Sequence, residues 1–195
     1  VNQEADVNTS QELSRLLWAK SAKKDRPDNW KPILAHLLDV AACAWEILER
    51  EPPSTLNQYA ADLGYPLSDK GRDAARRWLC ALIALHDLGK ASPAFEQQWP
   101  DWPARQEAAA HGLNWKTGDS GPKRKPVVSH SLISQATLPA LLEKKGWNRR
   151  IVRQLADAVG AHHGFRANGL ELNTARNPKE RGEDAWDCVR QELFD

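Results

Sequence analysis

Apolar residues recur at helical spacing along much of this chain. After Ile33 they occupy positions 37, 40, 41, 44 and 48, and the run stops at the Pro52-Pro53 pair. Residues three and four apart share one face of a helix, so this pattern predicts an amphipathic helix with Pro32 in its first turn. Shorter patterns predict helices over residues 10–20, 54–63 and 147–163.

The helix expected after Ser68 becomes steadily more apolar toward its end. Ser68 can cap its first turn. Its last turns contain Trp78, Leu79, Leu82, Ile83 and Leu85. Such an end is typical of a helix that is buried in the centre of a domain. Ser129 similarly predicts the start of a helix at His130, whereas glycines, prolines and basic residues over 111–128 predict a loop. No strand pattern of comparable strength occurs, so the sequence predicts an all-α fold.

Composition limits the class of protein. The chain has 195 residues, enough for one domain with a sizeable core, and 27 basic against 26 acidic residues leave a formal charge of +1. Net charge gives no argument for nucleic acid or membrane, so any electrostatic recognition must be local. The longest apolar run, residues 78–85, is too short to cross a bilayer, and residues 1–18 are too polar for a secretory signal. We expect a soluble cytoplasmic protein with no membrane partner.

The cysteines and the chain ends add two expectations. Cys43, Cys80 and Cys188 are odd in number and lack any Cys-x-x-Cys spacing, so they predict neither a disulfide framework nor a zinc ribbon, but small buried thiols. The chain opens on Val1, contains no methionine and stops within a predicted helix. We therefore expect a single domain over residues 1–195, cut from a longer polypeptide and truncated at its C-terminal end.

Histidines supply the candidate chemistry. The buried helix is followed by the pentapeptide His86-Asp87-Leu88-Gly89-Lys90, which places an imidazole beside a carboxylate. An unpartnered polar group costs about 2–7 kcal/mol to bury, and a metal ion bound by both side chains removes that cost. The adjacent pair His162-His163, near another predicted helix end, repeats the arrangement.

The other histidines are weaker candidates when each is taken alone. His36 lies beside the apolar stripe of its helix, where a histidine is more often a satisfied core residue than a ligand. His130 lies in a first turn and is compatible with simple exposure, and His111 is better interpreted as a surface residue. Together with the His-Asp pair, His36 and the His162-His163 pair predict an enzyme's ligand set for two metals.

Several segments together resemble one known family. They are the Leu85-His86-Asp87-Leu88-Gly89-Lys90 segment, His36 with residues 38–42, Ser129-His130-Ser131, and residues 160–165. Their order and approximate spacing are similar to the HD-superfamily nuclease domain of the CRISPR-associated nuclease-helicase of type I systems, from about residue 18 to residue 194. The opening Trp-Ala-Lys-Ser of residues 18–21 is also similar. The resemblance implies an HD-superfamily helical bundle with a metal site at its centre.

The resemblance also implies a role for each matching residue. The implied metal ligands are His36, His86 and Asp87 for one ion and His130, His162 and His163 for the second. Asp87 would bridge the two ions, and Lys90 would steady a substrate phosphate or the leaving oxygen, which makes Asp87 and Lys90 the implied catalytic residues.

One family feature has no counterpart here. The family adds a further Asp on a late helix, beyond the point where this chain stops, and Asp184 and Asp187 are too near His163 to match it. The first metal site is therefore expected to be incomplete in this chain.

The residues agree with phosphodiester hydrolysis. Imidazole-rich sites favour Mn, Fe, Co, Ni or Zn over the oxygen-preferring Mg. Two such ions can activate a water and neutralise charge on the leaving oxygen, so no side-chain nucleophile is needed. Basic clusters over 20–31, 123–125 and 144–153 are interleaved with four tryptophans, at positions 18, 30, 115 and 147. This mixture favours single-stranded nucleic acid, with solvated basic faces and core tryptophans as an equal alternative.

For the substrate, the resemblance implies single-stranded DNA in type I CRISPR interference. A helicase would unwind it and the RNA-guided surveillance complex Cascade would deliver it. The chain has no Gly-x-x-x-x-Gly-Lys-Ser/Thr phosphate loop, so the helicase must be a following domain or a separate protein. One alternative is an HD-type phosphohydrolase that acts on nucleotides or cyclic dinucleotides. The absence of a Gly-Tyr-Pro element after the His-Asp motif argues against this alternative. Another is a non-enzymatic module that uses its metals for folding or docking. The balance of endonuclease and exonuclease activity stays open.

Overall fold

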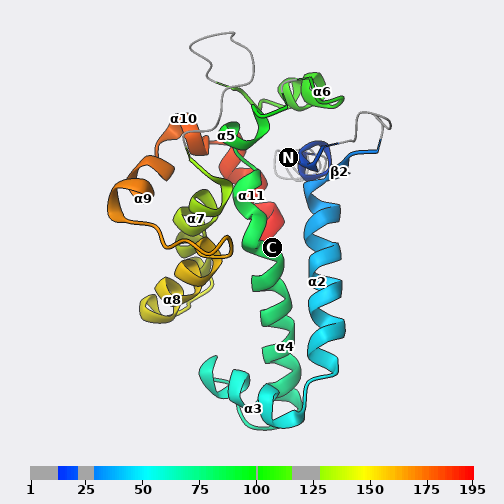
Figure 1. Cartoon of the computed structure of the whole chain (residues 1–195), viewed down its shortest axis with the longest axis vertical. Helices are drawn as coiled ribbons and strands as arrows, with labels where there is room; N and C mark the ends of the chain where they lie inside the picture. Colours follow the sequence, from blue (N-terminus) through cyan, green and yellow to red (C-terminus); the bar gives the residue numbers. More distant parts are fainter. Residues whose placement is uncertain (1–12, 22–28, 100, 116–127) are drawn as a thin grey trace, which may run out of the picture. The chain divides into compact units, whose positions relative to one another are not determined.

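The computed structural model describes residues 13–21, 29–99, 101–115 and 128–195. It comprises two compact units, one formed by residues 1–36 and 86–195 and the other by residues 37–85 (Figure 1). The single domain over residues 1–195 stays a prediction. No helix within the described residues combines the length and the apolar character needed to cross a membrane.

The unit over residues 37–85 is helical. It contains most of α2 (Ile33–Glu49), together with α3 (Pro53–Asp62) and α4 (Asp69–Ala84). Its core holds Ala44 and Leu48 of α2 with Cys80 of α4. Arg72 donates to Asn57 Oδ1 at 3.0 Å and so connects α4 to α3. As the amphipathic pattern in the sequence predicted, α2 buries one of its faces.

The other unit contains every candidate site residue. Its strands β1 (Trp18–Lys20) and β2 (Lys31–Pro32) pair antiparallel. The 3₁₀ helix η1 (Leu85–Lys90) begins at the last residue of the other unit. The helices that follow are α5 (Pro93–Glu96), α6 (Arg105–Ala110), α7 (His130–Lys144), α8 (Arg149–Gly160), α9 (Gly169–Ala175), α10 (Pro178–Arg181) and α11 (Ala185–Phe194). Helix α7 packs against both α8 and α9, and α10 packs against α5 (Figure 1).

Most of the predicted helices are confirmed. Ser68 caps α4, where its hydroxyl accepts from the Gly71 amide at 3.2 Å, and Ser129 caps α7 by accepting from the Leu132 amide at 3.4 Å. The helices predicted over 54–63 and 147–163 correspond to α3 and α8. The all-α prediction is confirmed, with the short β1–β2 pair as an addition.

Three sequence expectations are wrong in detail. The helix predicted over 10–20 is present at residues 13–16 but ends before β1, because Trp18–Lys20 finds backbone partners in Lys31–Pro32, which no local pattern reveals. Pro32 accordingly lies in β2 and precedes α2. Cys80 is buried, but Cys43 and Cys188 are exposed on their helices. Most of the loop predicted over 111–128 lies outside the described residues.

Two ionisable side chains, Arg190 and Glu96, are fully buried in the site-bearing unit. Arg190 of α11 is fully buried and donates to the carbonyl oxygens of Ala91 and Arg181, both at 2.6 Å, and to Asp187 Oδ1 at 2.7 Å. The α11 helix is thereby connected to the residue that follows η1. Glu96 of α5 is also fully buried.

Burial raises the pKa of Glu96 well above its ordinary value, while the Trp18 backbone amide and the Arg105 charge act in the opposite direction. In the unfolded chain the same carboxyl group ionises near its ordinary value, so between the two pKa values the folded state holds more protons. The contribution of Glu96 to folding stability therefore falls as pH rises above about 4.5.

We predict that Glu96→Gln increases the free energy of unfolding relative to the wild type, by an amount that grows between pH 5 and pH 8. The amide needs no proton to be neutral. Urea unfolding across this range measures the difference, with Glu107→Gln on the exposed surface of α6 as the matched control. A constant difference between wild type and Glu96→Gln would contradict the prediction.

Candidate metal centre

The carboxylate of Asp87 is the centre of the site. Asp87 lies in η1 and is buried, with 4% of its surface exposed. Its Oδ2 atom lies 2.8 Å from His36 Nε2, 3.2 Å from His86 Nε2 and 2.7 Å from Lys90 Nζ. One side-chain nitrogen from the start of α2 and two from η1 therefore lie within 3.2 Å of a single carboxylate oxygen.

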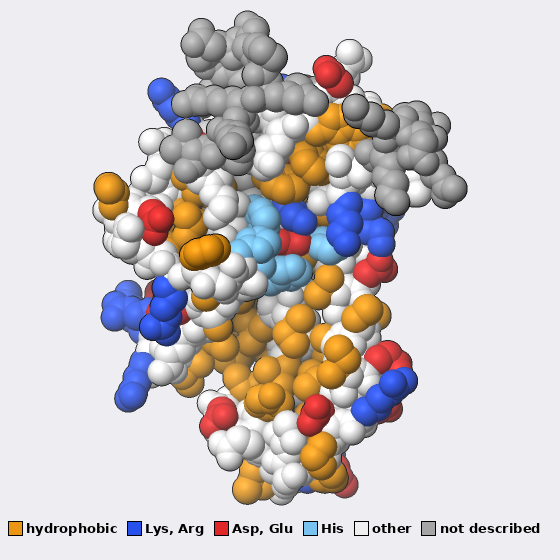
Figure 2. All heavy atoms as spheres, viewed as in Figure 1, with side chains coloured by type: hydrophobic (Ala, Val, Ile, Leu, Met, Phe, Trp, Pro, Cys, Tyr) orange, Lys and Arg blue, Asp and Glu red, His pale blue; other side chains and the backbone are white. Residues whose placement is uncertain are grey.

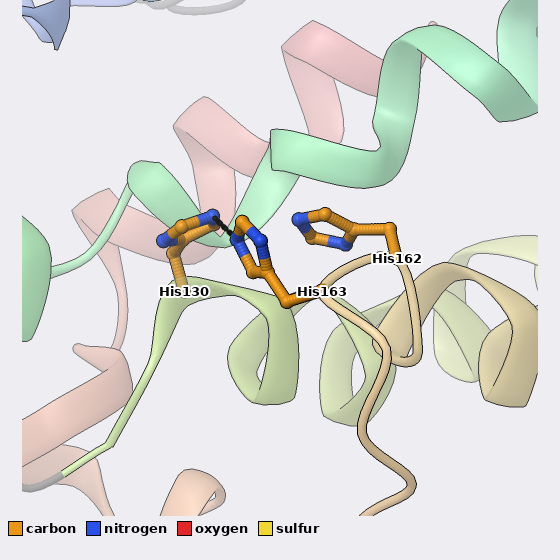
Figure 3. A group of neighbouring side chains, drawn as sticks. All are labelled: His130, His162 and His163. Atoms are coloured by element: carbon orange, nitrogen blue, oxygen red, sulfur yellow. Dashed lines mark hydrogen bonds between the residues drawn. The ribbon is translucent and has the colours of Figure 1, made fainter.

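The other carboxylate oxygen faces α7 and the turn after α8. Asp87 Oδ1 lies 3.0 Å from His130 Nε2 and 3.7 Å from His162 Nε2. His163 joins this side through His130, because the two Nε2 atoms lie 3.1 Å apart (Figure 3). On the molecular surface the histidines gather on one face, with an acidic side chain among them (Figure 2).

The side chains form two groups with metal-ligand geometry. One group is His36, His86 and Asp87, and the other is His130, His162 and His163; within each, the ligand atoms lie within 4.8 Å of one another. The membership of the two groups is the same as the sequence resemblance implied. Among the described residues, His111 belongs to neither group.

Electrostatics favours the protonation states that bind metal. Burial raises the pKa of Asp87, but hydrogen bonds from His130, His86 and Lys90 outweigh it and hold that pKa well below its ordinary value. Burial lowers the pKa of His36 and of His162. A carboxylate and neutral imidazoles are the forms that coordinate cations.

The second group also fits a cation for a different reason. The Nε2 atom of His162 is buried and has no hydrogen-bond partner among the described residues, while its Nδ1 lies 2.7 Å from the Val159 carbonyl oxygen. The backbone contact fixes the ring with Nδ1–H as donor and leaves Nε2 as a lone-pair donor. A divalent cation would satisfy that buried nitrogen, so the residues present fit a metal.

Close packing between η1 and α7 brings the groups together. A Cβ atom on Gly89 would overlap the His130 carbonyl oxygen and lie 2.6 Å from the Ser134 amide nitrogen, so only glycine permits this approach. Ser134 then joins the two elements: its hydroxyl accepts from the Gly89 amide at 2.7 Å and donates to the His86 carbonyl at 2.8 Å.

A second glycine serves the contact between α7 and α8. A Cβ atom on Gly160 would overlap the side chain of Gln135, which donates to Asp157 Oδ1 at 2.8 Å. The C-terminal end of α8 can therefore lie against α7, and the two histidines that follow it reach His130.

Comparison with known proteins identifies the family. The chain matches the family model described as the Cas3 HD domain over residues 18–195. The chain belongs to the Cas3 HD-domain family. This result confirms the resemblance found in the sequence, including the HD-superfamily helical fold.

Relatives of this Cas3 HD domain include a CRISPR-associated endonuclease/helicase Cas3 of Thermus thermophilus. The two are 36% identical over 189 residues, which is 95% of this chain and 18% of the relative. The chain thus spans about a fifth of the length of that protein.

Two solved structures are similar to this Cas3 HD domain. One is the Thermus thermophilus Cas3 HD domain in the presence of Ni²⁺, with 35% identity, a TM-score of 0.63, and 93% of this chain matched to 63% of the other. The second, a CRISPR-associated protein, has 30% identity and a TM-score of 0.77 over 96% of this chain and 19% of the other.

The sequence predicted which histidines and carboxylate gather in this Cas3 HD domain, but it did not predict the residues that support them. Ser134, Gln135 and Gly160 carry no metal-ligand chemistry, and their importance comes from contacts between helices that are distant in sequence. The sequence around a helical serine does not indicate whether its hydroxyl is buried and bonded to another element or exposed to solvent.

We predict that Ser134→Ala lowers the free energy of unfolding by about 1–3 kcal/mol, because it leaves the buried Gly89 amide and the partly buried His86 carbonyl without their shared partner. Urea unfolding measures the loss. Thr174→Ala is the matched control, since its hydroxyl donates to the Leu170 carbonyl within one exposed helix. Equal effects of the two substitutions would show that the hydrogen bonds of Ser134 to Gly89 and His86 do not stabilise the fold.

Proposed function

We propose that the two groups bind two divalent metal ions, with Asp87 shared between them. The observation that carries this proposal is the position of Asp87, whose two oxygens face different histidine groups. The imidazole-rich donors favour Mn, Fe, Co, Ni or Zn over Mg. The Ni²⁺ named for the similar Thermus thermophilus structure supports this choice of metal class.

We further propose that the chain is a deoxyribonuclease that cuts single-stranded DNA. Metal ions bound at such a site activate water and neutralise charge at the scissile phosphate. Lys90, buried beside Asp87, would add an ammonium group to hold a phosphate or the leaving oxygen. The relatives' description as endonuclease/helicase supports a phosphodiester substrate.

The nuclease would act with a helicase, in the cytoplasm, during type I CRISPR interference. The relatives' names join nuclease and helicase in one protein, and this chain corresponds to only 18% of the first of them. The helicase would expose single-stranded DNA, and the Cascade surveillance complex would recruit the nuclease to its target.

We predict that His36→Ala and His163→Ala each reduce the number of bound Mn²⁺ ions from two to one. Each substitution removes a candidate ligand from a different group. Loss of a residue that only hydrogen-bonds a metal ligand typically lowers metal affinity by about 10- to 100-fold, so the loss of a ligand itself should lower the affinity of the affected site by more than this. Isothermal titration calorimetry and metal analysis measure stoichiometry and affinity.

His111→Ala is the matched control for the metal titration, since His111 lies outside both groups. It should leave both sites intact. Equal loss of metal in His111→Ala and His36→Ala, or no binding by the wild type, would contradict the proposed centre.

We predict that Asp87→Asn abolishes Mn²⁺-dependent cleavage of circular single-stranded DNA. Lys90→Met should lower kcat by about 10²–10³-fold, the usual loss when one group that stabilises transition-state charge is removed. Gel assays with a circular substrate measure both, and Asp62→Asn and Lys179→Met, on exposed helical positions, are the controls. Cleavage of nucleotides or cyclic dinucleotides, with no cleavage of DNA, would instead favour a different HD phosphohydrolase.

A further inference from the structure

We propose that Phe165 and Arg166 form a platform for single-stranded DNA beside the metal centre, where Phe165 stacks on a base and Arg166 contacts a phosphate. The proposal rests on the proposed nuclease function and adds a binding site to it. The platform lies in the segment between α8 and α9, directly after the His162-His163 pair.

Phe165 has an unusual degree of exposure. Among the large apolar side chains in the described residues, Phe165 is the most exposed at 81%, and Leu170 in the first turn of α9 follows at 76%. Burying a side chain of this size is worth about 1.5–3 kcal/mol, so the fold leaves this gain unused at both positions. Exposed apolar surface that clusters next to a functional site is typical of a binding surface.

The segment that carries Phe165 is short and held at both ends. On one side the Gly164 amide donates to the Ala161 carbonyl at 2.7 Å, and Gly164 has a φ of +85° that favours glycine. On the other side Asn168 and Glu171 form a capping box, with backbone-to-side-chain bonds of 2.8 and 3.0 Å. The backbone on both sides of Phe165 is therefore held by hydrogen bonds, which limits the entropy lost on binding.

Phe165 is close to the metal centre along the chain. Its Cα lies two residues from that of His163, a distance of at most about 7.6 Å. His163 in turn reaches the Nε2 atom of His130. A base next to a phosphate at the centre is therefore within reach of the Phe165 ring.

Two of the four tryptophans predicted to interact with bases pack on other aromatic rings. Trp18 is buried and packs on Phe95 and Trp99, with ring centroids 4.3 and 5.7 Å away. Trp115 packs on Trp102 and Trp186, at 5.2 and 5.6 Å. Trp18 is therefore a core residue, whereas Phe165 provides an exposed ring on which a base can stack.

Arg166 supplies charge next to the ring. It is exposed, and no carboxylate among the described residues forms an ion pair with its guanidinium. A guanidinium without an internal partner can neutralise a phosphate of the bound strand. Alternating stacking and phosphate contacts are the usual means of binding single strands without sequence preference.

The test measures binding in EDTA, so that cleavage plays no part. Fluorescence anisotropy reports the affinity of the chain for a labelled oligothymidylate and for an abasic oligomer with the same phosphate backbone. We expect Phe165→Ala to weaken oligothymidylate binding by about 5- to 100-fold and to leave abasic binding unchanged, while Phe165→Trp retains the affinity. Arg166→Ala should weaken both oligomers equally and reduce the salt dependence of binding by about one phosphate contact.

Leu67→Ala is the matched control, because Leu67 is 66% exposed and lies in the other unit. It should bind both oligomers as the wild type does. The platform is refuted if the wild type binds neither oligomer or binds both equally, or if Phe165→Ala weakens both to the same extent. A chain that binds through Phe165 but cuts no DNA with Mn²⁺ would refute the nuclease function alone.

Discussion

A buried carboxylate is the constraint on which this structure depends. Asp87 is removed from water, and an ionised group in such a place must be matched by donors or cations. The chain supplies them from four separate stretches of sequence, namely the start of α2, the η1 turn, the start of α7 and the end of α8. The packing that brings these stretches together is thus also the packing that assembles the candidate metal centre.

The supports of the centre are backbone contacts between elements. Gly89 lets η1 lie directly on α7, Ser134 fastens the two, and Gly160 allows α8 to approach α7 closely. Arg190 adds a buried connection from α11 to the residue after η1. None of these residues belongs to either group of candidate ligands, yet they set the distances between the members of the groups, and metal sites tolerate little error in such distances.

The sequence predicted which candidate ligands lie together better than it predicted the packing around them. The His-Asp pair and the His162-His163 pair could be recognised because a polar cluster at the end of an apolar helix is costly without a partner. The helices over α2 and α4 followed from apolar spacing and the Ser68 cap. The strand at Trp18 could not be predicted, because its pairing partner, Lys31–Pro32, is separated from it in sequence and no local pattern indicates the pairing. The role of Ser134 could not be predicted either, because its sequence context does not differ from that of an exposed helical serine. The proposal for Phe165 depends on its exposure and on the burial of Trp18, which the sequence does not show.

Anomalous diffraction from crystals soaked in Mn²⁺ or Ni²⁺ tests the central claim most directly. The account predicts two anomalous peaks, one among His36, His86 and Asp87 and one among His130, His162 and His163, with a carboxylate oxygen of Asp87 next to each. Peaks located elsewhere, for example at His111, or no ordered metal at Asp87 would contradict it.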